Sequence, residues 1–226
     1  METQPQRSHL QLLSIPTFYI DKYPVTNKQW KKYLKESGYT PKDQTNYLLF
    51  WNEDKKDYDK TLDDVPVTWI SPREAQSFCR FYKKRLPHTY EWQYSGHGNN
   101  YSFIYPWGND EPNSTYIPKT HRGNDLPPPN AVNDHPMGRS CFGVYDLVGN
   151  VWQWTDSFED EHQRTVVVKG GSYYYPEGSG WYYPHALKLN QHNRYLIMDD
   201  SYEAGTVGFR CLVDATERKT KSISDI

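Results

Sequence analysis

Two histidines are close enough in the sequence to bind one metal ion together. His185 and His192 are seven residues apart in the sequence, and Asp199 follows them. Two imidazoles and one carboxylate form the ligand set of many nonheme iron oxygenases. The sequence therefore allows an iron site made of His185, His192 and Asp199, and with it oxidation chemistry.

The same stretch also suits a binding site without a metal. Aromatic rings stack on the apolar faces of ligands, and the polar tips of neighbouring side chains fix the ligand's orientation. The second interpretation is therefore a groove for a saccharide, a peptide or a small zwitterion, in which the histidines make ordinary hydrogen bonds. Its candidate ligand-binding residues are Trp181, Tyr183, His185, His192, Arg194 and Tyr195.

The chain has three cysteines, and they are far apart: Cys79, Cys141 and Cys211. At most one disulfide can form, so the fold is not a disulfide scaffold. We interpret Cys79 and Cys211 as buried thiols that pack as small apolar side chains.

Charge and hydropathy argue against two classes of partner. The 226 residues carry a formal net charge of −2, and the isoelectric point is near 6.4. These values give no reason to expect nucleic acid or an anionic membrane surface as a partner. No apolar run is long enough to span a membrane, and residues 1–9 lack the apolar centre of a signal peptide. We expect a soluble chain, with the cytoplasm as the favoured compartment.

Two segments have the sequence pattern of a helix start, in which Ser or Thr is followed three residues later by Glu or Gln. We expect helices to begin at Thr26 and at Ser71, because apolar residues then recur at helical spacing. Gly38 should end the first helix. A third, short helix is expected after Thr89, and it should carry Trp92 inward.

The rest of the chain predicts little regular structure. Residues 12–20, 165–169 and 206–213 are rich in β-branched or aromatic side chains and predict short strands. Pro, Gly and Asn crowd residues 105–139, and such a long irregular segment is usually functional or held by a ligand. The expected fold class is α+β, with two amphipathic helices and short antiparallel strands.

The segment Gly143–Trp154 carries the clearest local signal. Hydrophobic residues are dense there, and Gly149 and Asn150 interrupt them. Both residue types tolerate left-handed backbone angles better than most. We therefore expect a sharp, buried turn whose carbonyls and Asn150 side chain face a polar group.

Several segments together resemble the sulfatase-modifying-factor superfamily, which includes the formylglycine-generating enzymes. The same domain forms the C-terminal part of ergothioneine-type sulfoxide synthases. The resemblance covers about residues 15–213 and implies a C-type-lectin-like fold. The segments that carry it are Phe18–Asn27, Lys84–Tyr94, Gly143–Trp154, Gly170–Ser172 and Gly208–Cys211.

The chain departs from this family in two ways. The family's opening strand, an apolar run that ends in Gly and Met, has no counterpart. Either the chain is the C-terminal piece of a longer protein, or the sheet edge is built differently. The two copper-binding cysteines of the formylglycine-generating enzymes are also missing, because residues 172–210 contain no cysteine. Cuprous copper prefers thiolate ligands, so the cysteine-dependent oxidase mechanism is excluded.

The resemblance also implies calcium, which family members hold with Asn and Asp side chains and backbone carbonyls. Calcium takes six to eight oxygen ligands, which irregular loops supply well. The matching positions are Asn150, Val151 and Gln153 in one loop, and Asn124 and Asn133 in another. The family usually has Glu where this chain has Gln153, and the lost charge should weaken the site. The alternative is a metal-free turn in which Asn150 bonds backbone groups.

The resemblance leaves two functions open. In the sulfoxide synthases the iron histidines come from a separate helical domain, and this domain contributes substrate contacts. We expect a nonheme-metal oxidoreductase or the substrate-binding half of one. The alternative is a non-catalytic, lectin-like ligand-binding domain. The expected organisation is a lead-in at 1–14, one domain at 15–213 and a polar tail at 214–226.

Overall fold

The computed structural model describes residues 13–123, 125–160, 165–176, 181–196 and 203–215, with only the backbone at 159–160 and 193–196. The helices are α1 (Asn27–Ser37), α2 (Pro72–Phe81) and α3 (Thr89–His97), with short 3₁₀ turns η1 (Lys60–Leu62), η2 (Pro136–Gly138) and η3 (His185–Leu187). The strands are β1 (Phe18–Ile20), β2 (Trp152–Asp160), β3 (Thr165–Lys169), β4 (Asn193–Leu196), β5 (Val207–Gly208) and β6 (Leu212–Asp214).

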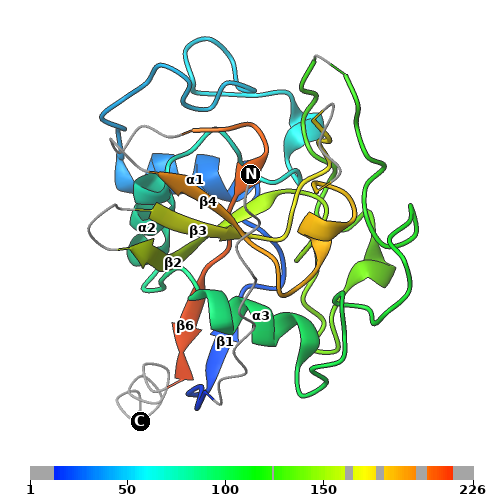
Figure 1. Cartoon of the computed structure of the whole chain (residues 1–226). Helices are drawn as coiled ribbons and strands as arrows, with labels where there is room; N and C mark the ends of the chain where they lie inside the picture. Colours follow the sequence, from blue (N-terminus) through cyan, green and yellow to red (C-terminus); the bar gives the residue numbers. More distant parts are fainter. Residues whose placement is uncertain (1–12, 124, 161–164, 177–180, 197–202, 216–226) are drawn as a thin grey trace.

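The strands form two separate sheets (Figure 1). The larger one has the order β4-β3-β2-β5 and lies at the centre of the view, with α1 and α2 on one side and α3 below it. Its β2–β5 pair is parallel, whereas its other pairs are antiparallel. In the smaller sheet, β1 pairs antiparallel with β6, so that Phe18 lies opposite Asp214. The two ends of the domain therefore meet in one sheet.

The helices begin and end for the reasons that the sequence gives. Both expected capping boxes are formed, at Thr26 and at Ser71. Helix α1 ends at Gly38, whose φ of 66° is the left-handed angle that glycine adopts most easily. Helix α3 starts at Thr89 and buries Trp92 completely. All three expected helices are confirmed.

The strand predictions were less complete. Residues 165–169 form β3 as expected, and the predicted strand at 206–213 is divided into β5 and β6. Of residues 12–20, only 18–20 form a strand, and residue 12 lies outside the described residues. The longest strand, β2, was not expected. Its segment was interpreted as a turn followed by irregular chain.

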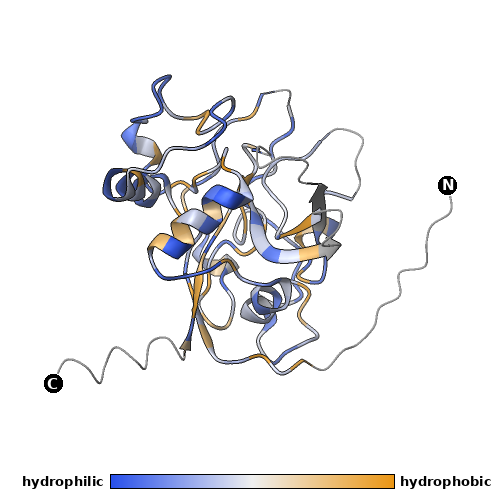
Figure 2. Cartoon of the chain, turned by 90° about the vertical axis from the view of Figure 1, so that its left-hand side faces the viewer, coloured by the Kyte–Doolittle hydropathy of each residue, from blue (hydrophilic) through white to orange (hydrophobic). Residues whose placement is uncertain are grey.

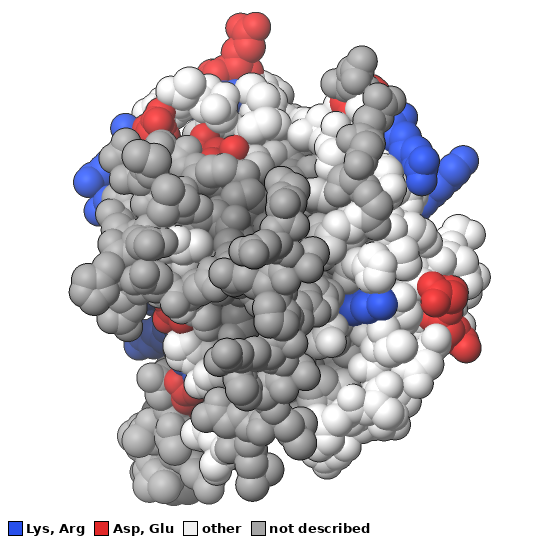
Figure 3. Space-filling view, in the orientation of Figure 1, with Lys and Arg blue, Asp and Glu red and all other residues white. Residues whose placement is uncertain are grey.

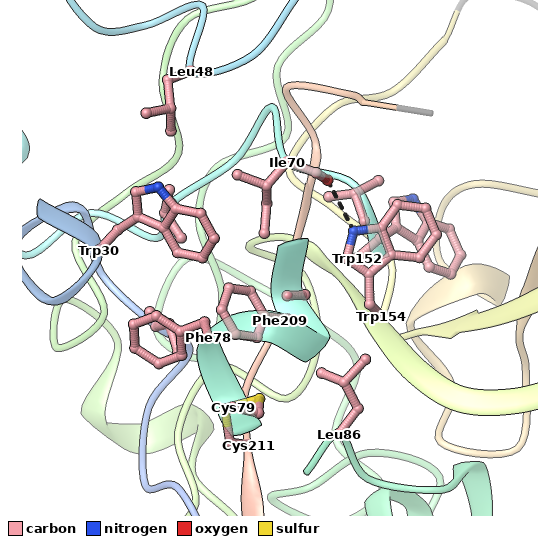
Figure 4. Packing of buried hydrophobic residues seen from close by; sticks show 14 of the residues in the cluster. Trp30, Leu48, Ile70, Phe78, Cys79, Leu86, Trp152, Trp154, Phe209 and Cys211 are labelled. Carbon is pink, nitrogen blue, oxygen red and sulfur yellow. Dashed lines mark hydrogen bonds between the residues drawn. A yellow bond between two sulfur atoms is a disulfide. The ribbon is translucent and has the colours of Figure 1, made fainter. Parts of the chain in front are cut away.

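A core rich in aromatic rings holds the helices against the larger sheet (Figure 4). Phe78 of α2 stacks on Trp30 of α1, with 5.5 Å between ring centroids, and meets Phe209 edge to face at 5.3 Å. The indole N–H of Trp154 donates to the Ile70 carbonyl at 3.1 Å. Hydrophobic and hydrophilic residues alternate along the helices (Figure 2). A second cluster forms around Trp92.

A disulfide joins Cys79 to Cys211, which corrects the sequence interpretation. Helix α2 places Cys79 beside the segment between β5 and β6, and the two Cα atoms are 5.7 Å apart. The expectation of two buried, reduced thiols was wrong, because the fold joins residues that are 132 positions apart in the sequence. Cys141 is a free, exposed thiol.

The surface carries both signs of charge. On the face shown in Figure 3, Lys and Arg side chains alternate with Asp and Glu side chains in small, separate groups. Within the described part of the chain, no helix has the length and apolar character needed to cross a bilayer.

Candidate functional site

The interior is organised by one arginine that is fully buried. Arg210 donates from Nε to Gln153 Oε1 at 2.7 Å and from Nη2 to the Tyr145 carbonyl at 2.6 Å. It also donates to the carbonyls of Asp21 and Asp146, each at 3.0 Å. A guanidinium can be buried at this depth because its donors meet fixed acceptors. We call this arrangement the Arg210 network.

The Arg210 network uses every polar position of Gln153. The Gln153 oxygen accepts from Arg210 and from the Trp92 indole, and its amide donates to the carbonyls of Asp146 and Leu147. An amide oxygen has two lone pairs and an amide nitrogen has two hydrogens. The Gln153 side chain therefore has nothing left to offer a cation in this arrangement.

The two loops considered for calcium do meet. Asn150 Oδ1 accepts from the Asn130 N–H at 3.1 Å, and Asn150 Nδ2 donates to the Asn130 carbonyl and to Asp146 Oδ2. These are the backbone hydrogen bonds that the metal-free alternative predicts for Asn150. Val151 is fully buried and Asn133 is exposed, while Asn124 lies outside the described residues. Calcium stays a prediction.

A glycine next to the Arg210 network yields a first testable prediction. Gly170 has a φ of 104°, and a Cβ there would collide with the carbonyl oxygen of Leu147. We expect Gly170→Ala to lower the free energy of unfolding by about 2 to 4 kcal/mol, measured by urea denaturation. The matched control is Gly108→Ala, which has a φ of 128° but open space around the new methyl group. It should cost only about 1 kcal/mol. Equal losses in the two variants would show that the collision does not matter.

The described aromatic residues of the predicted groove pack on two parts of the core. Trp181 stacks on Trp152 with ring centroids 6.1 Å apart, and Tyr182 meets Trp152 edge to face at 6.2 Å. Tyr183 turns toward the second core cluster, where its hydroxyl donates to the Pro112 carbonyl at 2.8 Å. Trp181 and Tyr183 are therefore engaged with different parts of the core.

The predicted histidines lie at the surface. His185 begins η3 and His192 precedes β4, and both are exposed. Arg194 and Tyr195 belong to β4, where the backbone alone is described, and Asp199 lies outside the described residues. Among the side chains that the structure describes, no three His, Cys, Asp or Glu residues gather as a metal site would require. The iron site stays a prediction.

Sequence reasoning missed a different cluster, which centres on Trp69. Buried polar atoms without a hydrogen-bond partner are rare in native proteins, and each needs an explanation, such as a ligand. Four such atoms occur among the described residues: Thr68 Oγ1, Trp69 Nε1, Glu203 Oε1 and, in a different segment, Ser172 Oγ. The backbone N–H of Trp69, unlike its indole N–H, does have a partner: it donates to the Ala204 carbonyl at 3.1 Å, so residues 68–69 and 203–204 are in contact. We call Thr68, Trp69, Glu203 and the residues that pack on them the Trp69 site.

The backbone of the Trp69 site is strained. Leu48 and Trp69 have φ angles of 50° and 56°, which bulky residues rarely adopt. The Leu48 N–H donates to the Trp69 carbonyl at 3.0 Å, so the two unusual residues hold each other in place. Such strain persists where surrounding contacts impose it, and it is common at functional sites. Glycine at 205 allows the close approach, because a Cβ there would lie 2.8 Å from Trp69 Nε1.

Acidic groups dominate the electrostatics of the Trp69 site. Burial raises the pKa of the Glu203 carboxyl to about 8, and the charges of Glu74 and Asp43 raise it as well. The backbone N–H of Asn46 and the charge of Lys55 act in the opposite direction. Burial also raises the pKa of Glu74 to about 7. The site therefore favours a proton, or another positive charge, beside Glu203.

These pKa values yield a second prediction. The pKa of Glu203 rises from 4.5 to about 8 on folding. Between these two pH values, the native chain therefore keeps a proton that the unfolded chain has lost. This contribution to stability is present below pH 4.5 and is lost as the pH rises through 8. We expect Glu203→Gln to be more stable than the parent chain at pH 8 by about 1 to 2 kcal/mol, with no difference near pH 4. Denaturation at both pH values measures it. The control Glu53→Gln, at an exposed position, should leave the stability unchanged at both pH values. If Glu203→Gln has the same stability as the parent chain at both pH values, the raised pKa of Glu203 is contradicted.

Known proteins resemble this chain along most of its length. Residues 2–215 match the family described as the sulfatase-modifying factor enzyme 1-like domain. The inactive C-alpha-formylglycine-generating enzyme 2 of Bos taurus is 27% identical over 202 residues, which cover 71% of this chain and 67% of that protein. The formylglycine-generating enzyme of Bos taurus is 25% identical, in a match that covers 89% of this chain and 67% of that protein. The hercynine oxygenase of Mycolicibacterium smegmatis is 28% identical over 170 residues, covering 65% of this chain but only 38% of that protein.

Two solved structures share the fold. The structure of PvdO from Pseudomonas aeruginosa aligns with a TM-score of 0.61 at 16% identity, covering 87% of this chain and 80% of that one. The structure of CarF aligns with a TM-score of 0.60 at 16% identity, covering 87% and 86%. At such low identity the likeness concerns the fold alone. It confirms the expected α+β, C-type-lectin-like architecture.

Proposed function

Because the chain belongs to the sulfatase-modifying factor enzyme 1-like family, we propose that it is a ligand-binding member that lacks the thiol chemistry of the formylglycine-generating enzymes. The ligand is a small molecule, a saccharide or a peptide. The match spans about two thirds of the formylglycine-generating relatives, so their activities enter here only as comparisons.

The cysteine inventory carries this proposal. A two-thiolate copper site needs two free cysteines close together. Residues 172–210 contain none, and Cys79 and Cys211 are joined to each other. Cys141 is left alone on the surface. No pair of thiolates remains with which to bind copper.

The Trp69 site is the region we assign to the ligand. Its unpartnered indole N–H and Thr68 hydroxyl suit an oxygen of a ligand, and the Glu203 carboxyl suits a hydroxyl or an ammonium group. Phe50 packs edge to face on the Trp69 ring at 6.1 Å. Ala204, whose carbonyl accepts from the Trp69 backbone N–H, packs on the first core cluster. The Trp69 and Phe50 rings supply aromatic surface for stacking.

Two assays test the proposal together. With a cysteine-containing sulfatase peptide, copper and oxygen, mass spectrometry should detect no formylglycine. N-acetylglucosamine, glycine betaine and the same peptide are then titrated while the eight tryptophan indole N–H signals are followed by NMR. We expect at least one probe to shift the Trp69 signal and to lose about tenfold in affinity in Trp69→Phe. Tyr101→Phe, at an exposed position, is the matched control. Formylglycine formation, or no shift of Trp69 with any probe, would refute the proposal.

A metal-dependent oxidoreductase, or the substrate-binding half of one, is the second candidate. The similarity to a hercynine oxygenase supports it, since the match covers a part of that protein. His185, His192 and Asp199 are the residues proposed for iron, and Asn150 and Val151 for calcium. Elemental analysis of chain purified without chelators tests both metals. Iron that is retained by the parent chain and lost in His192→Ala would favour this candidate over simple ligand binding.

A further inference from the structure

One edge of β1 is paired and the other is open. The Ala215 N–H donates to the Thr17 carbonyl, and the Asp21 N–H donates to the Cys211 carbonyl. Residues 17, 19 and 21 therefore direct their backbone groups toward β6, and the residues between them direct theirs to the opposite side. Among the described residues, none bonds to the outward N–H or C=O of Phe18 or Ile20.

The open edge has a definite length. The next outward-facing residue, Lys22, already accepts a hydrogen bond at its carbonyl from the Tyr145 N–H at 2.8 Å. The gap therefore lies opposite Phe18 and Ile20, and residues 143–145 close it at one end. A strand of about five residues would fill such a gap, because every second residue faces the edge.

A pocket of about 710 Å³ adjoins this edge. Its walls are residues 15–20, Tyr94 of α3, and Phe142 and Val144 on the other side. Phe142 is 55% exposed, so a large part of this apolar side chain at the edge of the pocket is in contact with water. An occupant with an apolar side chain at the right register would remove this surface from water.

A positive charge beside the pocket favours an occupant that carries a negative charge. Lys22 also lines it, with its ammonium 4.9 Å from the ring centroid of Tyr145 and 5.2 Å from that of Tyr23. No ion pair joins Lys22 to a carboxylate in the described part of the chain. The two rings fix the position of this charge, and a carboxylate on the occupant would complement it.

We propose that the open edge of β1 and its pocket bind an extended segment of another polypeptide, which adds as a strand, inserts an apolar side chain and places an acidic residue at Lys22. Backbone hydrogen bonds to Phe18 and Ile20 supply affinity, as in other cases of strand addition. The pocket and Lys22 select the side chains. This surface is separate from the Trp69 site and does not depend on the function proposed for it.

The test uses the full chain and the peptide acetyl-Val-Thr-Val-Thr-Glu-amide. Amide hydrogen exchange is followed by NMR at saturating peptide. Exchange at Phe18 and Ile20 should slow by at least about tenfold, while Tyr19, whose backbone faces β6, should not change. A peptide with N-methyl groups on the edge-facing residues should bind about tenfold more weakly or not at all, and so should a peptide with Lys in place of Glu.

A chain variant checks the pocket. Thr17→Trp, at an exposed position on the pocket wall, should fill it and weaken binding by about tenfold, whereas Leu49→Trp, at an exposed position elsewhere, should bind as the parent does. Unprotected Phe18 and Ile20 amides at millimolar peptide would overturn the proposal, and so would equal binding of the N-methylated peptide. Tighter binding after deletion of residues 1–12 would also overturn it, because the edge would then belong to the chain's own N-terminal segment.

Discussion

Arg210→Met should lower the free energy of unfolding by about 4 to 5 kcal/mol, because one buried and one partly buried carbonyl would be left without a partner and the charge-assisted hydrogen bonds would be lost. The carbonyls of Asp21 and Tyr145 have no other hydrogen bond within the described residues. Gln153 would keep its bond from Trp92 but lose the one from Arg210. Since small domains are typically stable by about 5 to 15 kcal/mol, the variant should lie close to the limit of folding.

Guanidinium denaturation of the purified chain measures this loss. The matched control is Arg80→Met, since Arg80 is exposed on α2 and its loss should change stability by less than about 0.5 kcal/mol. Arg210→Lys tests the geometry, because one ammonium cannot reach acceptors that the planar guanidinium reaches on several sides. If Arg210→Lys is as stable as the parent chain, the Arg210 network does not act as we describe.

Removal of the disulfide has the second largest expected effect. The bond joins residues 132 positions apart, and a crosslink over so long a loop restricts the unfolded chain strongly. We expect Cys79→Ala combined with Cys211→Ala to lose about 2 to 5 kcal/mol. Both sulfurs are completely buried, so reductants should act on the folded chain only after it opens.

Thiol counting is the direct check. Denatured, unreduced protein should react with one equivalent of a thiol reagent, at Cys141, and reduced protein with three. Cys141→Ala is the control and should leave stability within about 0.5 kcal/mol of the parent. Three reactive thiols in the unreduced protein would refute the disulfide and restore the original interpretation of Cys79 and Cys211.

The helices could be predicted because their signals are local. A hydroxyl at Thr26 or Ser71 and a polar side chain three residues later satisfy each other within one turn, whatever the rest of the chain does. Strand β3 was equally readable, because Thr165–Lys169 is a run of β-branched residues. These elements account for the correct fold class.

Strand β2 was missed because buried and exposed residues do not alternate along its first half, as they would in a strand with one exposed face. Gln153 and Thr155 are as buried as the neighbouring Trp152 and Trp154, since Gln153 and Thr155 meet polar partners inside the fold. A single sequence does not show those partners. The preceding Gly149 and Asn150 also pointed to a loop. The same lack of long-range information hid the disulfide.

The Trp69 site was not predicted from the sequence. Trp181, which the sequence analysis proposed as a binding residue, packs on the core against Trp152, and its role in binding stays a prediction. Sequence reasoning did not find Trp69 or Glu203, because the signals there are a positive φ and unpartnered buried atoms, and neither is visible before the chain is folded. A tryptophan in a left-handed conformation has no local sequence pattern. The Trp69 site could be recognised only from the structure.

The pairing of β1 with β6 affects how the protein is made on the ribosome. Residues 18–20 emerge early, but their partners at 212–214 are synthesised almost 200 residues later. At about 5 to 20 residues per second, the early strand waits for at least about ten seconds with both edges unpaired. Cys79 waits for Cys211 over much of that time. A nascent chain stopped before position 211 can form neither this sheet nor this crosslink, so the last residues of the domain complete a structure that its first residues began.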